Sequence, residues 1–159
     1  MLITIGGMVL LATIIMRVNT NYLTADEVLM NSKLCVLATS LAGSIIEEAS
    51  GKAFDAATDT AAVDNLSALT APYGLGHAYK EIYENFNDFD DFNNFTKIDS
   101  SLPSATFVIK SEVGYIDPSN PTVFVNTRTW HKKIVVEVTS ESMDDTVRMS
   151  SVFSYWYFR

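Results

Sequence analysis

The chain of 159 residues contains few residues that break helices or crosslink a fold. Its four prolines all lie after Ala71, so a helix can run through the first part of the chain without interruption. Its one cysteine, Cys35, cannot pair within the chain, which excludes an intramolecular disulfide. We expect Cys35 to be a small, buried, apolar residue.

Basic residues are also scarce. The sequence has 11 Lys and Arg against 19 Asp and Glu, which gives a net charge of −8 at pH 7 and an isoelectric point near 4.6. The basic residues form no run or stripe, so we expect no surface that binds nucleic acid. The acidic surplus instead favours a soluble exposed surface.

Charge is missing altogether from Met1 to Met16. This stretch is apolar on every side of a helix, and such a segment belongs in lipid or inside an assembly. It is slightly shorter than the roughly 20 residues that usually span a bilayer. No basic region precedes it and no convincing small-residue cleavage site follows it, so we expect it to be retained and not removed as a signal peptide. The residues that we expect to pack between subunits are Leu2, Ile3, Ile5, Gly6, Gly7, Val9, Leu10, Leu11, Ala12, Ile14 and Ile15.

Beyond Arg17 the apolar residues recur every three or four positions, which is helical spacing. They comprise Val18, Tyr22, Ala25, Val28, Leu29, Leu34, Ala38, Leu41, Ile45 and Ala49. We predict one helix from about Leu2 to about Ser50, roughly 70 Å long at 1.5 Å per residue, that stops at Gly51. Because a compact domain of this size is much narrower, part of the helix has to project. We divide the chain into a protruding apolar helix, residues 1–24, and a globular head, residues 25–159.

From Gly51 to Pro103 the sequence predicts loops and short turns. Phenylalanines recur at every third position from Phe86 to Phe95, and we expect them to fasten a long loop to the core of the head. Asp88, Asp90 and Asp91 lie among them. Their carboxylates offer oxygen ligands to Ca²⁺, but the glycine and the bidentate glutamate of an EF-hand loop are missing. We favour a solvated acidic loop over a calcium site.

The pattern then changes to the alternation of β-strands. We predict strands over residues 107–115, 122–126, 130–139 and 147–157, with a turn at residues 117–121. Connections this short join antiparallel neighbours. The sequence therefore predicts an α+β fold, in which a long N-terminal α-helix packs on a C-terminal antiparallel β-sheet of about three or four strands.

No combination of residues indicates catalysis. His77 and His131 have no second His or Cys at the spacing of a metal site. The sequence contains no glycine-rich phosphate loop and no nucleophile elbow. We therefore expect no enzyme activity, no cofactor and no metal. Glycosylation sequons at Asn65 and Asn94 are of a kind that is frequent by chance.

An apolar helical half, an amphipathic second half, a variable loop and a C-terminal antiparallel sheet together resemble a type IV pilin or pseudopilin in its mature form. The clearest local similarity is ATSLAGSIIEEASGKAFD, from Ala38 to Asp55, which is similar to the helix end of minor pilins and pseudopilins. The family's leader and processing site do not occur in the sequence, so either the numbering starts after cleavage or the chain is processed differently. The glutamate typical of the fifth mature position is Ile5 here.

The resemblance implies a structural subunit of an extracellular, type IV pilus-like helical filament of identical subunits. Its apolar helix would sit in the inner membrane until the pilus assembly machinery moves it into the filament core, where Gly6, Gly7 and Ala12 permit close packing. Residues 18–21, Val-Asn-Thr-Asn, have weak helix propensity, so we expect local unwinding there in a filament. The alternatives are a minor pseudopilin of a type II secretion system and a single-pass membrane-anchored module whose aromatic, Asp-rich loop binds a ligand.

Overall fold

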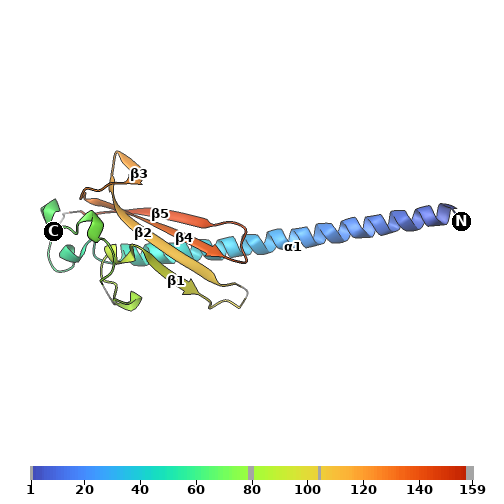
Figure 1. Ribbon diagram of the computed structural model, residues 1–159, viewed down its shortest axis with the longest axis horizontal. Helices are drawn as coiled ribbons and strands as arrows, with labels where there is room; N and C mark the ends of the chain where they lie inside the picture. The colour runs from blue at the N-terminus through green and yellow to red at the C-terminus, as the bar shows by residue number, and fades with distance from the viewer. Residues whose placement is uncertain (1, 79–80, 104, 157–159) are drawn as a thin grey trace.

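The computed structural model describes residues 2–78, 81–103 and 105–156, apart from the side chains of Leu2 and Ile3. Within these residues there is one α-helix and a sheet of five strands, and short 3₁₀ turns fill much of the stretch between them. The elements are α1 (Leu2–Ser50), β1 (Phe95–Asp99), β2 (Phe107–Asp117), β3 (Asn120–Phe124), β4 (His131–Ser140) and β5 (Val147–Ser154). Figure 1 shows α1 extending far beyond a head that the sheet and loops form around its C-terminal half. The predicted α+β fold is confirmed.

The helix α1 is continuous over its 49 residues, as the absence of proline predicts. It ends where expected, because the backbone N–H of Gly51 donates to the carbonyls of Glu47 and Glu48 at 3.0 and 3.1 Å and the chain then turns away. The helix also continues through residues 18–21 in this single subunit. The unwinding expected there concerns a filament and stays a prediction.

The sheet is antiparallel, with the strand order β1-β2-β4-β5 and with β3 paired to the end of β2. Its centre is the long pairing of β2 with β4, which runs from Phe107 opposite Ser140 to Tyr115 opposite Lys132. The predicted turn between β2 and β3 is confirmed. β5 ends at Ser154, and the end of the predicted strand at residue 157 lies outside the described residues.

The edge strand β1 is the element that the sequence does not predict. Of its five residues only Phe95 is buried, and the strand's one aliphatic residue, Ile98, is 67% exposed. An edge strand that covers little core lacks the alternation of apolar and polar residues by which strands are recognised. The sheet therefore has five strands where three or four were expected.

The core of the head lies between α1 and one face of the sheet, and α1 contacts β2, β4 and β5. The buried face of the helix consists of Leu34, Ala38, Ala42, Ile45 and Ala49. The facing side chains of the sheet are Phe107, Ile109, Val113, Ile134, Val136 and Val138. The phenylalanines at positions 86, 89, 92 and 95 are all buried in this core, so the predicted fastening of the loop is confirmed.

Candidate functional site

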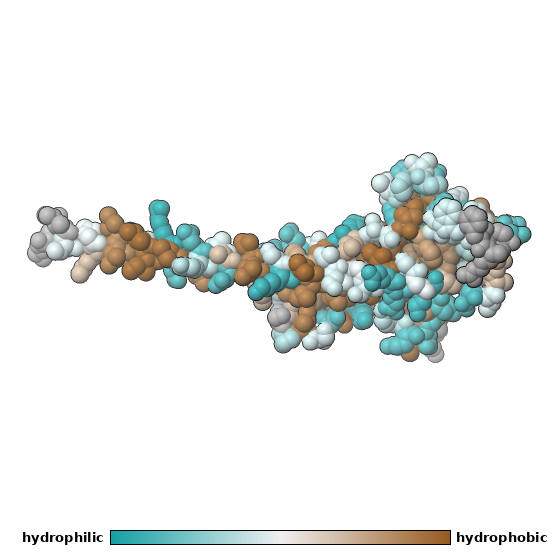
Figure 2. Space-filling view, turned by 180° about the vertical axis from the view of Figure 1, so that it is seen from behind, coloured by the Kyte–Doolittle hydropathy of each residue, from teal (hydrophilic) through white to brown (hydrophobic). Residues whose placement is uncertain are grey.

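The first feature of functional interest is the part of α1 that projects from the head. Every side chain from Thr4 to Met30 is exposed, and the first buried one is Leu34. Ile5 is 53% exposed and Leu10 is 62% exposed. Figure 2 shows brown, apolar side chains gathered near the free end of the helix. Of the predicted packing residues, this surface contains Ile5, Gly6, Gly7, Val9, Leu10, Leu11, Ala12, Ile14 and Ile15, whereas the side chains of Leu2 and Ile3 lie outside the described residues.

The surface of this segment is apolar up to Arg17, and the hydroxyl group of Thr13 changes this little. Thr13 Oγ1 donates to the carbonyl of Leu10 at 2.8 Å, so its hydroxyl is satisfied by the helix itself. At Gly6 and Gly7 an added Cβ would meet no atom within 4 Å. The backbone at these two glycines is therefore accessible to a neighbouring helix.

The next part of α1 is exposed as well. Val18, Tyr22 and Leu29 belong to the predicted packing face, but only the part of that face from Leu34 onward packs within the subunit. A shallow groove of about 550 Å³ runs along the exposed part and is lined by Asn21, Thr24, Ala25, Val28, Leu29 and Ser32. By length and composition α1 could cross a membrane, a test that signal sequences and buried core helices also pass. An apolar surface of this extent marks a contact with lipid or with another protein chain.

The second feature is a lysine enclosed in the head. Nζ of Lys132 lies 2.8 Å from Oδ2 of Asp55 and 2.6 Å from Oδ1 of Asp90. It also donates to the carbonyl of Phe54 at 2.8 Å. The rings of Phe54 and Tyr115 have their centroids 4.4 and 5.1 Å from this nitrogen. We call these five residues the lysine cluster; all five are buried.

The two aspartates of the lysine cluster differ in their surroundings. Asp55 accepts hydrogen bonds from Lys132, from the backbone of Ala57, and from both the backbone and the hydroxyl of Thr70. Burial raises the pKa of Asp55, but the charge of Lys132 and these hydrogen bonds outweigh burial and hold the pKa below its usual value. Asp90 Oδ1 makes an ionic contact with Lys132 without hydrogen-bond geometry, and Oδ2 has no hydrogen-bond partner in the described part of the chain. At Asp90, burial outweighs the charge of Lys132 and raises the pKa to about 7.

Asp88 and Asp91 hold the loop before β1 in shape. Oδ1 of Asp88 accepts from the backbone N–H groups of Asp90 and Asp91, at 2.7 and 3.2 Å. Oδ2 of Asp91 accepts from those of Asn87 and Asp88, at 2.9 and 3.2 Å. These aspartates are buried, so the predicted solvated acidic loop is wrong. Backbone N–H groups replace water as the partners of these two carboxylates.

The described residues contain no group of three or more His, Cys, Asp and Glu side chains arranged to hold a metal ion. His77 stacks on Phe86, with ring centroids 5.4 Å apart. Cys35 is partly exposed and not buried as expected, because it lies beside the buried face of α1 that begins at Leu34. Asn65 and Asn94, the two sequon asparagines, are exposed.

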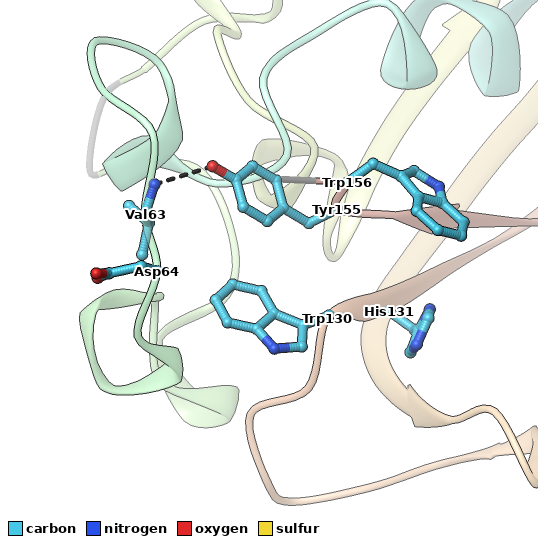
Figure 3. A pocket seen from close by; sticks show the side chains of 6 residues that line it. All are labelled: Val63, Asp64, Trp130, His131, Tyr155 and Trp156. Carbon is cyan, nitrogen blue, oxygen red and sulfur yellow. Dashed lines mark hydrogen bonds between the residues drawn. The ribbon is translucent and has the colours of Figure 1, made fainter. Parts of the chain in front are cut away.

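The third feature is an aromatic cavity of about 520 Å³ where the chain leaves β5 (Figure 3). Its lining residues are Val63, Asp64, Trp130, His131, Tyr155 and Trp156. The rings of Trp130 and Tyr155 stack with centroids 5.4 Å apart, and the Tyr155 hydroxyl accepts from the backbone N–H of Val63 at 2.9 Å. Nδ1 of His131 lies 2.8 Å from the hydroxyl of Ser154. The hydrogen bond from Val63 fastens its loop to the chain that leaves β5, while the other two contacts join the neighbouring ends of β4 and β5.

The lysine cluster was not predicted from the sequence, although one signal for it exists. Lys132 lies two and four residues before Ile134 and Val136, so it shares their buried face of β4. A lysine in phase with core residues indicates a buried cation that needs partners. Its partners lie at the starts of two short 3₁₀ turns, with Asp55 capping one and Asp90 beginning the other. Turns of three residues are too short for a periodic pattern to predict the direction of a side chain.

Comparisons of the chain with protein-family models, with curated proteins and with solved structures find no match. The likeness to a known family is therefore one of architecture. A long N-terminal helix with an apolar projecting half, packed through its other half on an antiparallel sheet, is the general architecture of type IV pilins.

Proposed function

We propose that the chain is a structural subunit of an extracellular, type IV pilus-like helical filament. The observation that carries this proposal is the exposed apolar surface on residues 4–16 of α1, a helix whose other end is seated in the head. Such a surface is stable in lipid or against other apolar surfaces, and unstable in water. A bundle of these helices would cover it and place the heads on the outside.

Before assembly, the lipid of the inner membrane would surround the apolar surface of residues 4–16. A move from lipid into a helix bundle gains no free energy from leaving water, so association depends on close packing and favours small residues at the contact. The open backbone at Gly6 and Gly7 supports this step. The exposed apolar residues from Val18 to Leu29 would then meet neighbouring subunits closer to the heads.

The proposal predicts that a variant lacking residues 1–24 is a soluble monomer. The first buried residue of α1 is Leu34, so this deletion leaves the core of the head complete. The measurement is size-exclusion chromatography with light scattering, together with electron microscopy of the full chain as the control. A truncated chain that still forms filaments would contradict the proposal.

A minor pseudopilin of a type II secretion system is the second candidate, and Ile5 in place of the family's glutamate favours it. Long filaments made of this chain alone would exclude it. The third candidate, a membrane-anchored binding module, was motivated by the aromatic, Asp-rich loop. That loop buries its phenylalanines and aspartates in the head, which removes the observation in its favour.

A further inference from the structure

We propose that an intramolecular amide, an isopeptide bond, forms in the lysine cluster between Nζ of Lys132 and the side-chain carboxyl group of Asp90. Asp55 acts as the base that takes a proton from Nζ and passes it to the departing hydroxyl group. The bond would join the loop before β1 to the central strand β4. It is independent of the function proposed above, since it concerns the head alone.

The geometry brings the two reacting groups together before any reaction. Nζ of Lys132 is 2.6 Å from Oδ1 of Asp90, and the two side chains are 0% and 4% exposed. The side chains come from separate segments that the fold holds side by side. Groups held at contact distance react as parts of one molecule, which removes most of the entropic barrier.

Exclusion of water favours the condensation. The rings of Phe54 and Tyr115 lie against the amine and occupy space that water would otherwise take. Burial penalises an ammonium and a carboxylate, and so brings the neutral amine and the neutral acid closer to the ion pair in free energy. Hydrolysis of the product would need water in the same enclosed place.

The two aspartates differ in the way that the reaction requires. Neither carboxylate oxygen of Asp90 has a hydrogen-bond partner within the described residues, so the oxygen that receives the proton can leave without breaking a hydrogen bond of the fold. Asp55 is held by the backbone N–H groups of Ala57 and Thr70 and lies 2.8 Å from Nζ, where a carboxylate can act as a base. The pKa directions agree with these roles, since the pKa of Asp90 is raised and that of Asp55 is lowered.

The reaction balances without a further reactant. A proton passes from the Lys132 ammonium to the Asp90 carboxylate, which gives an amine and a carboxylic acid. Nζ then attacks Cγ of Asp90 while Asp55 accepts a proton from Nζ. Asp55 returns this proton to the departing hydroxyl group of Asp90. One C–N bond forms, one C–O bond breaks, one molecule of water leaves, and no group is oxidised or reduced.

The test is tryptic digestion and mass spectrometry of the full chain purified in detergent. Trypsin cleaves an unmodified chain after Lys132. The proposed bond blocks this cleavage and joins the peptide 81–97 to the peptide 129–133, with the summed mass of the two less one water. Lys133 is the internal control, because its buried Nζ contacts the carbonyls of Pro121 and Thr122 and not a carboxylate, so cleavage after it should be normal.

Three variants assign the roles within the cluster. Lys132→Arg keeps the positive charge but offers no amine, so it should yield no linked peptide. Asp55→Asn should slow the reaction about 100-fold or more, as expected for the loss of a base. Asp90→Asn should give a linked peptide of unchanged mass, because its amide loses ammonia where the acid loses water.

Complete cleavage after Lys132 in the wild-type chain, with no linked peptide, would overturn the proposal without any variant. A peptide that links 129–133 to the peptide 53–80, which contains Asp55, would overturn the choice of Asp90 as the acceptor.

Discussion

Single residues decide how the head tolerates charge in its interior. Four aspartates, at positions 55, 88, 90 and 91, are buried near one lysine, Lys132. One cation cannot neutralise four carboxylates, so backbone N–H groups and protonation have to do the rest. The pKa of Asp88 is raised to about 6 by burial and by the charge of Asp91, and that of Asp90, in the chain without the proposed amide, is raised to about 7 by burial. The stability of the head should therefore change with pH below neutrality.

For Asp88 the sign of this change follows from its two pKa values. The folded-state pKa of about 6 lies above the ordinary value of 3.8, so between these values the folded chain holds a proton that the unfolded chain has lost. The free energy of unfolding should fall as the pH rises through this window. Asp88→Asn removes the charge beside Asp91 but keeps an oxygen for the two backbone donors. We expect it to stabilise the head by about 1–3 kcal/mol above pH 7 and to flatten the profile.

The measurement is denaturant unfolding of the head, residues 25–159, from pH 4 to pH 8. Asp145→Asn is the matched control, since Asp145 is exposed and its substitution should leave the profile unchanged. A wild-type head whose stability rises between pH 4 and pH 6, with no effect of Asp88→Asn, would contradict the assignment.

At the scale of elements, α1 joins the head through small residues. Ala38, Ala42 and Ala49 are fully buried, and their size lets the helix lie close to β4 and β5. The adjacent Gly43 differs, since a Cβ added there would meet no atom within 4 Å. The two neighbours 42 and 43 therefore form a matched pair for testing this packing.

We expect Ala42→Leu to destabilise the head by about 1–3 kcal/mol through overpacking. Gly43→Ala should stabilise it by about 0.5–1 kcal/mol, because glycine costs conformational entropy within a helix. Denaturant unfolding of the truncated head measures both. Equal effects of the two variants would show that the helix is not seated on the sheet as described.

The sequence predicts those elements whose residues repeat with a regular period. The uncharged run to Met16 and the three- and four-residue spacing beyond Arg17 predict α1, and alternation predicts the strands that flank the core. β1 has almost no such alternation and is missed. The burial of the Asp88 loop is missed as well, because it depends on Lys132, a residue distant in sequence whose contact arises only in the folded chain.

At the scale of the whole molecule, the surface of the projecting helix end differs from that of the head in polarity and charge. The free end of α1 is apolar and uncharged, whereas the chain as a whole carries a net charge of −8 (Figure 2). Heads of like charge repel one another, so in the proposed filament the attraction between subunits would come from the helices. Close packing of neighbouring helices at Gly6 and Gly7 would supply this attraction.

Gly6→Leu and Gly7→Leu should therefore reduce filament formation while the chain stays in the membrane fraction, because leucine preserves the apolar anchor but blocks close approach. Leu10→Met is the control, as it keeps both size and polarity. Counting filaments by electron microscopy and measuring the membrane-bound chain by immunoblot separates the two roles. Normal filaments in both glycine variants would show that these glycines do not lie at a helix contact.

The most direct test of the filament proposal is electron microscopy of filaments sheared from the native cells, with mass spectrometry to identify their main protein. We predict long filaments in which this chain is the principal component, with the apolar half of α1 in the centre and the sheet domain outside. Recovery of the chain only in the membrane fraction, with sheared filaments made of other proteins, would contradict the account.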